Sequence, residues 1–129
     1  MTTRGREMFE EHMRYVRAND IAGMVNDTFA DDAVYYHNFP FFETPPPFVI
    51  TGKDKIIEAL STIFKRQGDL RVGEPMGWSE SDNHIAFQIV VTSPNTGSWL
   101  ISDFWFLRDG KMFQYFGYGM PLPLQVAIP

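Results

Sequence analysis

The chain has 129 residues, a length that suits one domain able to bury roughly two-thirds of the surface exposed by its unfolded form. Its net charge of −5 argues against nucleic acid as a partner, because neutralising phosphates requires a basic patch. It has no cysteine, which excludes disulfides and thiolate ligands, and no apolar run approaches the roughly 20 residues that span a bilayer. Since the N-terminus also lacks the apolar core of a signal peptide, we expect a single cytoplasmic domain over residues 1–129.

Two amphipathic helices are predicted at the start of the chain. Between Arg4 and Ala18, residues that recur at intervals of three and four form one mostly apolar stripe along the helix. They are Met8, Phe9, His12, Met13 and Val16. Asn19-Asp20 can end this helix and cap a second one from Ile21 to about Phe29. Because His12 lies on the apolar stripe, the favoured interpretation is a core histidine with satisfied hydrogen bonds.

A short strand, an aromatic loop and a third helix are expected next. In the strand Ala33–Phe39, the period of two puts Tyr35 and His37 on the same side. Residues 39–48 contain four phenylalanines and three successive prolines, so they should form a stiff apolar loop that folds back over the domain. The apolar pattern of Lys53 to Gln67 predicts a helix, which Gly68 ends.

The second half alternates strands with turns. Residues 70–79 contain two glycines and a proline, a composition typical of an edge strand or a bulge. The strand from His84 to Thr92 places Phe87 and Ile89 on one face. Residues 120–129 are rich in proline and are expected to form a packed or draped tail.

The strongest local signal is a β-hairpin from Trp99 to Tyr118. Two apolar runs flank Asp109-Gly110, a pair typical of a type I′ turn because both central residues need φ > 0. If Arg108 pairs with Lys111, one face holds Asp103, Trp105, Leu107, Met112, Gln114 and Phe116. The opposite face then holds Ser102, Phe104, Phe106, Phe113, Tyr115 and Gly117.

The direction of Asp103 depends on this register. In the favoured two-residue register it lies on the face assigned to a dimer contact, away from Tyr115. One extra residue in the turn at Gly110 would instead bring Asp103 to the side of Tyr115. Buried in a cavity, this carboxyl would have a raised pKa and become a candidate general acid.

Helices that precede a run of antiparallel strands predict an α+β fold, with the helices on one face of a curved sheet. The helices can cover only one of the two apolar faces of that sheet. A second copy about a two-fold axis is the simplest cover for the other face, so we predict a homodimer through the sheet.

Several short motifs follow one another in a defined order between Arg4 and Tyr118. They are Arg14-Tyr15-Val16, Asp20-Ile21-Ala22-Gly23-Met24-Val25, Phe29-Ala30-Asp31-Asp32-Ala33, Gly52 with Ile56-Ile57, and Asp109-Gly110-Lys111. Their order and spacing resemble the nuclear transport factor 2-like superfamily, which includes ketosteroid isomerases and SnoaL-type polyketide cyclases. The resemblance implies a cone-shaped fold, in which three N-terminal helices and a curved antiparallel sheet enclose a hydrophobic pocket.

The resemblance also implies positions for site residues. In the isomerases, a carboxylate at the end of the first strand moves a proton, while a tyrosine and a protonated aspartate hold the oxyanion. Here the base position falls on His37, and the tyrosine position falls on Tyr15 or near His12, depending on how the helix is anchored. The acid position falls on Ser102, one residue from Asp103. Further residues expected to line the pocket are Tyr35, Phe41, Phe87, Ile89, Phe104 and Tyr115.

These expectations support a cofactor-free enzyme of isomerase or cyclase type, which moves a proton on a hydrophobic polycyclic or terpenoid-like carbonyl compound. His37, Tyr15 and Asp103 are the catalytic candidates, since an imidazole with a pKa near ~6.5 suits proton transfer at neutral pH. The alternatives are a module that binds an apolar ligand without chemistry and a dimerising accessory domain that fills its own cavity. The three histidines lack metal-ligand spacing, so no metal is expected.

Overall fold

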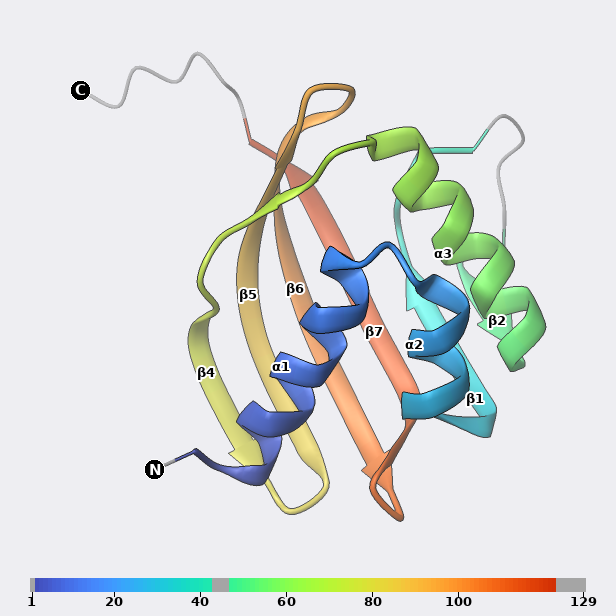
Figure 1. The fold of residues 1–129 in the computed structure, drawn as a ribbon, viewed down its shortest axis with the longest axis vertical. Helices are drawn as coiled ribbons and strands as arrows, with labels where there is room; N and C mark the ends of the chain where they lie inside the picture. The colour runs from blue at the N-terminus through green and yellow to red at the C-terminus, as the bar shows by residue number, and fades with distance from the viewer. Residues whose placement is uncertain (1, 43–46, 123–129) are drawn as a thin grey trace.

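The computed structural model describes residues 2–42 and 47–122 (Figure 1). Residues 43–46 of the predicted aromatic loop and most of the predicted tail lie outside this part of the chain. The helices are α1 (Arg4–Arg17), α2 (Ile21–Thr28) and α3 (Lys53–Gln67). The strands are β1 (Phe29–His37), β2 (Val49–Thr51), β3 (Arg71–Val72), β4 (Met76–Ser81), β5 (His84–Ser93), β6 (Gly97–Arg108) and β7 (Lys111–Pro121).

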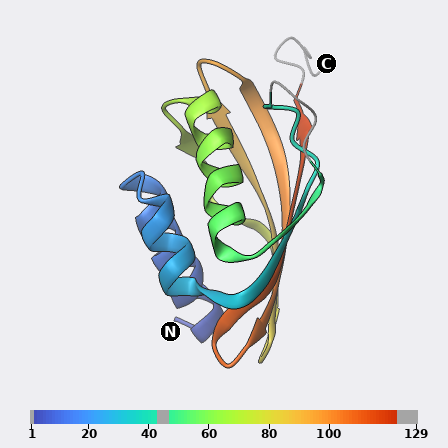
Figure 2. The same ribbon diagram turned by 90° about the vertical axis from the view of Figure 1, so that its right-hand side faces the viewer.

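The described residues form an α+β fold with three helices on one face of a curved seven-stranded sheet, as Figure 2 shows. The strand order is β2-β1-β7-β6-β5-β3, and β4 also pairs with β5. The predicted fold class is confirmed, with one correction. β1 and β7 pair in parallel, so the sheet is mixed rather than purely antiparallel. These strands are separated by most of the chain, so no tight turn imposes an antiparallel pairing on them.

Local sequence signals set the helix boundaries. The Thr3 hydroxyl accepts a hydrogen bond from the Arg6 amide at 3.2 Å at the start of α1. The Asp20 carboxylate accepts one from the Gly23 amide at 2.9 Å at the start of α2. Both residues act as N-caps, and Gly68 ends α3 with a φ of 78°. The three predicted helices are therefore confirmed.

The predicted hairpin is formed by β6 and β7. Asp109 and Gly110 have φ angles of 53° and 75°, and Arg108 pairs with Lys111, so the two-residue turn is confirmed. The predicted register beyond the turn is wrong. Leu107 pairs with Met112, but Phe106 pairs with Gln114, which leaves Phe113 as an extra residue in β7. This β-bulge reverses the alternation of every later residue in that strand.

The bulge decides which side chains face the helices. Met112 and Tyr115 are three residues apart, so regular alternation would place them on opposite faces, whereas the bulge buries both. Asp103 pairs with Gly117 and faces the helices together with Tyr115. This is the direction of the alternative register, reached through a bulge at Phe113 instead of a longer turn.

The opposite face of the sheet has no helix over it in the described part of the chain (Figure 2). An outer aromatic patch lies there, made of Tyr36, Phe104, Phe106, Phe116 and Tyr118. The rings of Tyr36 and Phe116 stack at 4.2 Å, and Phe104 exposes 42% of its surface. Phe104 and Tyr118 are the exposed members of this patch, and Tyr36, Phe106 and Phe116 are half-buried.

Candidate functional site

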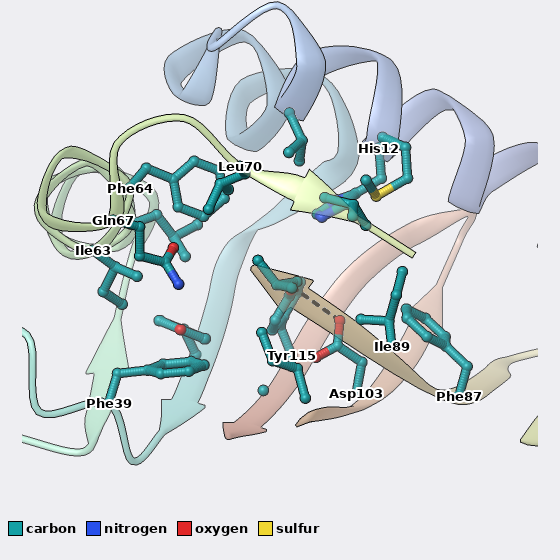
Figure 3. Close-up of a pocket in the computed structure, with 18 residues that line it drawn as sticks. His12, Phe39, Ile63, Phe64, Gln67, Leu70, Phe87, Ile89, Asp103 and Tyr115 are labelled. Atoms are coloured by element: carbon teal, nitrogen blue, oxygen red, sulfur yellow. Dashed lines mark hydrogen bonds between the residues drawn. The ribbon is translucent and has the colours of Figure 1, made fainter. Parts of the chain in front are cut away.

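A cavity of about 80 Å³ lies between α1, α3 and the concave face of the sheet (Figure 3). Most of its wall is aliphatic or aromatic. Its polar side chains are His12, Tyr35, Gln67, Asp103 and Tyr115. Since a cavity of about 150 Å³ accommodates benzene, this one has room for a few water molecules, and a ring would require its wall to move.

Asp103 is the only carboxylate among the described residues that line the cavity. The Tyr115 hydroxyl and the Trp105 indole N–H donate to its Oδ2 at 3.3 and 3.4 Å. Its Oδ1 is buried and has no hydrogen-bond partner within the described part of the chain. Burial raises the pKa of this carboxyl from 3.8 to about 7, although the two donors act in the opposite direction. Asp103 can therefore both accept and donate a proton near neutral pH.

The polar groups that surround the buried Asp103 are uncharged. Burial raises the pKa of both Tyr35 and Tyr115 well above the usual value, and the nearby Asp103 charge adds to this, so both remain neutral phenols. Gly117 lies opposite on β7, where a Cβ atom would stand 3.3 Å from Asp103 Oδ1 and 3.0 Å from Tyr115 Cε1. The absence of a side chain at Gly117 leaves room beside the free oxygen.

His12 reaches the same cavity from α1. Its ring centroid lies 4.8 Å from that of Trp105 and 5.9 Å from that of Tyr115. Burial lowers its pKa from 6.5 to about 4, so the imidazole is neutral at physiological pH. Its Nδ1 is buried without a hydrogen-bond partner among residues 2–42 and 47–122, so the expectation of a satisfied core histidine is wrong. His12 can offer a ligand a hydrogen bond but not a charge.

Gln67 is a polar residue of the cavity wall that the sequence analysis did not identify. It is the last residue of α3, and the side chain is directed into the cavity (Figure 3). The available signal was its position, since it continues the buried stripe of Ile56, Leu60 and Ile63 by one further turn. A glutamine at the end of a helix carries no other sequence signal of a buried polar group.

Four apolar side chains separate the cavity from a larger outer cleft between the α1–α2 turn and α3. They line both spaces and are Val16, Phe64, Leu70 and Val72. Because only side chains intervene, rotamer changes can join the two spaces without unfolding a helix or a strand.

Two of the three predicted catalytic residues lie outside the cavity wall. His37 is buried at the end of β1, beside the rings of Tyr35 and Phe39 at 5.1 and 6.1 Å. The Phe39 amide donates to its Nδ1 at 3.1 Å, which leaves the proton of the neutral ring on Nε2. The Tyr15 hydroxyl donates to the Asp27 carboxylate at the surface. Neither residue therefore contacts a ligand placed beside Asp103 in this structure.

The other predicted positions divide between the cavity and the opposite face. The cavity wall includes His12, Tyr35, Phe87, Ile89, Asp103 and Tyr115. Phe41 lies outside it and packs against Trp99 at 5.0 Å. Ser102 accepts a hydrogen bond from Gln88 on the outer face, and Phe104 belongs to the outer aromatic patch. The expected pocket positions of Ser102 and Phe104 are wrong, because the bulge turns Tyr115, and not these residues, toward the helices with Asp103.

Within the described residues, no helix is long and apolar enough to cross a membrane. Over the same residues, no three histidine, aspartate or glutamate side chains gather as a ligand set for a metal ion.

No family model and no curated protein matches this sequence. Solved structures do match. A Bacillus subtilis protein provisionally assigned as an isomerase is 21% identical, with a TM-score of 0.68 over 92% of this chain and 87% of the other. An NTF2-like protein of unknown function from Burkholderia pseudomallei is 16% identical, with a TM-score of 0.68 over 90% of both chains. A Mesorhizobium loti protein provisionally assigned as a SnoaL-like polyketide cyclase is 19% identical, with a TM-score of 0.56 over 87% of this chain and 96% of the other. The chain has the nuclear transport factor 2-like fold.

Proposed function

We propose that this chain binds a hydrophobic carbonyl compound in the cavity and moves a proton on it without a cofactor, as an isomerase or a cyclase does. The observation that carries the proposal is Asp103, a buried carboxyl with a pKa of about 7 and one free oxygen in an apolar cavity. Perturbed carboxyls in such surroundings are typical of acid–base sites. The provisional assignments of two similar folds, as an isomerase and as a cyclase, support the same class of reaction.

In the proposed reaction, Asp103 removes a proton from the carbon next to the ligand carbonyl through its free Oδ1. The Tyr115 hydroxyl and the Trp105 N–H remain bound to Oδ2 and hold the carboxyl in place. The neutral His12 ring can donate from Nδ1 to the enolate oxygen that forms, in surroundings where water does not compete. Return of the proton to another carbon completes an isomerisation.

Deuterium exchange into 4-methylcyclohexanone in D2O, followed by NMR, tests this reaction class without knowledge of the natural substrate. Asp103→Asn should lower the exchange rate by about 10² to 10⁴, the usual contribution of a general base. Asp82→Asn, at an exposed turn between β4 and β5, is the matched control and should leave the rate unchanged. Exchange by the Asp103 variant at the wild-type rate would refute the proposal.

A module that binds without chemistry is the second candidate. It is favoured by the mostly apolar wall of the cavity, which suits retention of an apolar ligand. In that case wild-type protein would bind 4-methylcyclohexanone saturably and show only background exchange.

The homodimer is also a proposal, in which a second copy covers the outer aromatic patch about a two-fold axis. The exposed rings on this face support it, since one copy leaves them in water.

A further inference from the structure

Gln67 brings a primary amide to the cavity wall. The residue exposes only 3% of its surface, and its side chain lines the cavity. A leucine or methionine at this position would continue the apolar stripe of α3 without bringing a polar group inside. The amide is therefore a polar group that a molecule in the cavity can reach.

The position of this amide differs from that of the carboxyl. Gln67 approaches from the end of α3, while Asp103 and Tyr115 approach from the sheet, and Figure 3 shows them on separate parts of the wall. The rest of the wall is mostly aliphatic and aromatic, and it includes Phe39 and Ile89. The cavity thus offers polar groups from two sides, the end of α3 and the sheet, within a mainly apolar wall.

We infer that the ligand is an uncharged, mostly apolar molecule with two oxygen groups, a carbonyl held at Asp103 and a hydroxyl or second carbonyl held by the Gln67 amide. This inference rests on the proposed function and adds to it the class of ligand and a specificity-determining residue. A primary amide both donates and accepts hydrogen bonds, so it recognises a hydroxyl as well as a carbonyl.

The charge of the wall supports an uncharged ligand. No lysine or arginine lines the cavity among the described residues, and His12 is neutral because burial lowers its pKa to about 4. An anionic ligand would therefore be buried without a compensating charge, next to a carboxyl that is itself partly ionised at neutral pH.

Two probes of nearly equal size test the inference. 4-Methylcyclohexanone has one oxygen, and 4-hydroxycyclohexanone replaces its methyl group by a hydroxyl. Affinities are measured by NMR titration for wild-type protein and for Gln67→Met, which keeps the length of the side chain and removes the amide. We expect the substitution to weaken 4-hydroxycyclohexanone about tenfold relative to 4-methylcyclohexanone. Gln88→Met, at an exposed glutamine on the outer face, should leave the ratio of the two affinities unchanged.

A second measurement needs no variant. The side-chain NH2 resonances of Gln67 in wild-type protein should shift with 4-hydroxycyclohexanone and remain in place with 4-methylcyclohexanone. Equal shifts with both probes, or an affinity ratio unaffected by Gln67→Met, would overturn the role of Gln67 while leaving ligand binding intact. If neither probe binds wild-type protein, the proposed function fails, and this inference fails with it.

Discussion

Replacing Asp103 by asparagine should make the protein more stable at alkaline pH while it slows proton transfer. The folded state holds this carboxyl at a pKa of about 7, against 3.8 in an unfolded chain. Between these values the folded state keeps a proton that the unfolded state has lost, so stability falls as pH rises from about 4 to about 7. Asparagine is nearly isosteric, and its carbonyl can still accept from Tyr115 and Trp105.

The magnitude follows from the two pKa values. Since one pKa unit corresponds to about 1.4 kcal/mol, the pKa difference of Asp103 is worth roughly 4 kcal/mol above pH 7. Asp103→Asn should therefore gain several kcal/mol over wild type at pH 8 and almost nothing at pH 4. That gain is large beside a typical total stability of about 5–15 kcal/mol.

Urea denaturation of both proteins from pH 4 to pH 8.5 provides the measurement, and all other titrating groups cancel in the difference between the two curves. The slope with urea should be the same for both, because the surface exposed on unfolding does not change. A stability difference that stays constant over this pH range would show that Asp103 titrates normally, and the reasoning for an acid–base site would be falsified.

Four further changes have defined outcomes. His12→Gln should flatten the acid side of the pH–stability curve. The pKa of this imidazole is about 4 in the folded state and 6.5 in the unfolded state, so wild type loses up to roughly 3 kcal/mol of stability as pH falls between these values. A curve unchanged by the substitution would contradict a neutral buried ring. Gly117→Ala places a methyl group 3.3 Å from Asp103 Oδ1 and should therefore weaken the binding of 4-methylcyclohexanone in an NMR titration. Unchanged binding would show that Oδ1 does not contact the ligand. His37→Ala should lower the urea midpoint of unfolding and leave the rate of deuterium exchange unchanged. An unchanged midpoint with a lowered exchange rate would instead make His37 the base. Phe116→Arg, in the outer aromatic patch, should convert a dimer to a monomer in sedimentation analysis, whereas a wild-type monomer would refute the proposed assembly.

The elements that local sequence determines were predictable. The caps at Thr3 and Asp20, the glycine after α3 and the Asp109-Gly110 turn depend on residues within a few positions of one another. The register of β7 was not predictable in this way. Phe113 is extruded because burying both Met112 and Tyr115 requires a bulge, and that requirement comes from helices distant in the sequence.

The candidate site shows the same division. The fold resemblance placed a polar cluster in an apolar pocket, and six of the expected residues do line the cavity. The resemblance did not predict which individual side chains line the cavity. Tyr35 and His37 are two residues apart on the same side of β1, yet His37 lies outside the cavity wall. A period of two specifies a face of a strand but not how far along that face a cavity extends.

The distribution of unsatisfied polar groups is the strongest argument that the cavity is functional. A chain selected only for stability would place apolar residues at positions 12 and 103, because each of these buried side chains leaves a polar atom without a partner among the described residues and has a pKa shifted by burial. They come from α1 and β6 and face one small space, whereas the third such atom, His37 Nε2, lies outside the cavity wall. Destabilising choices that converge in this way are expected where a ligand, and not the fold, supplies the missing partners. The pH-dependent cost at Asp103 is the part of this argument that can be measured before any ligand is known.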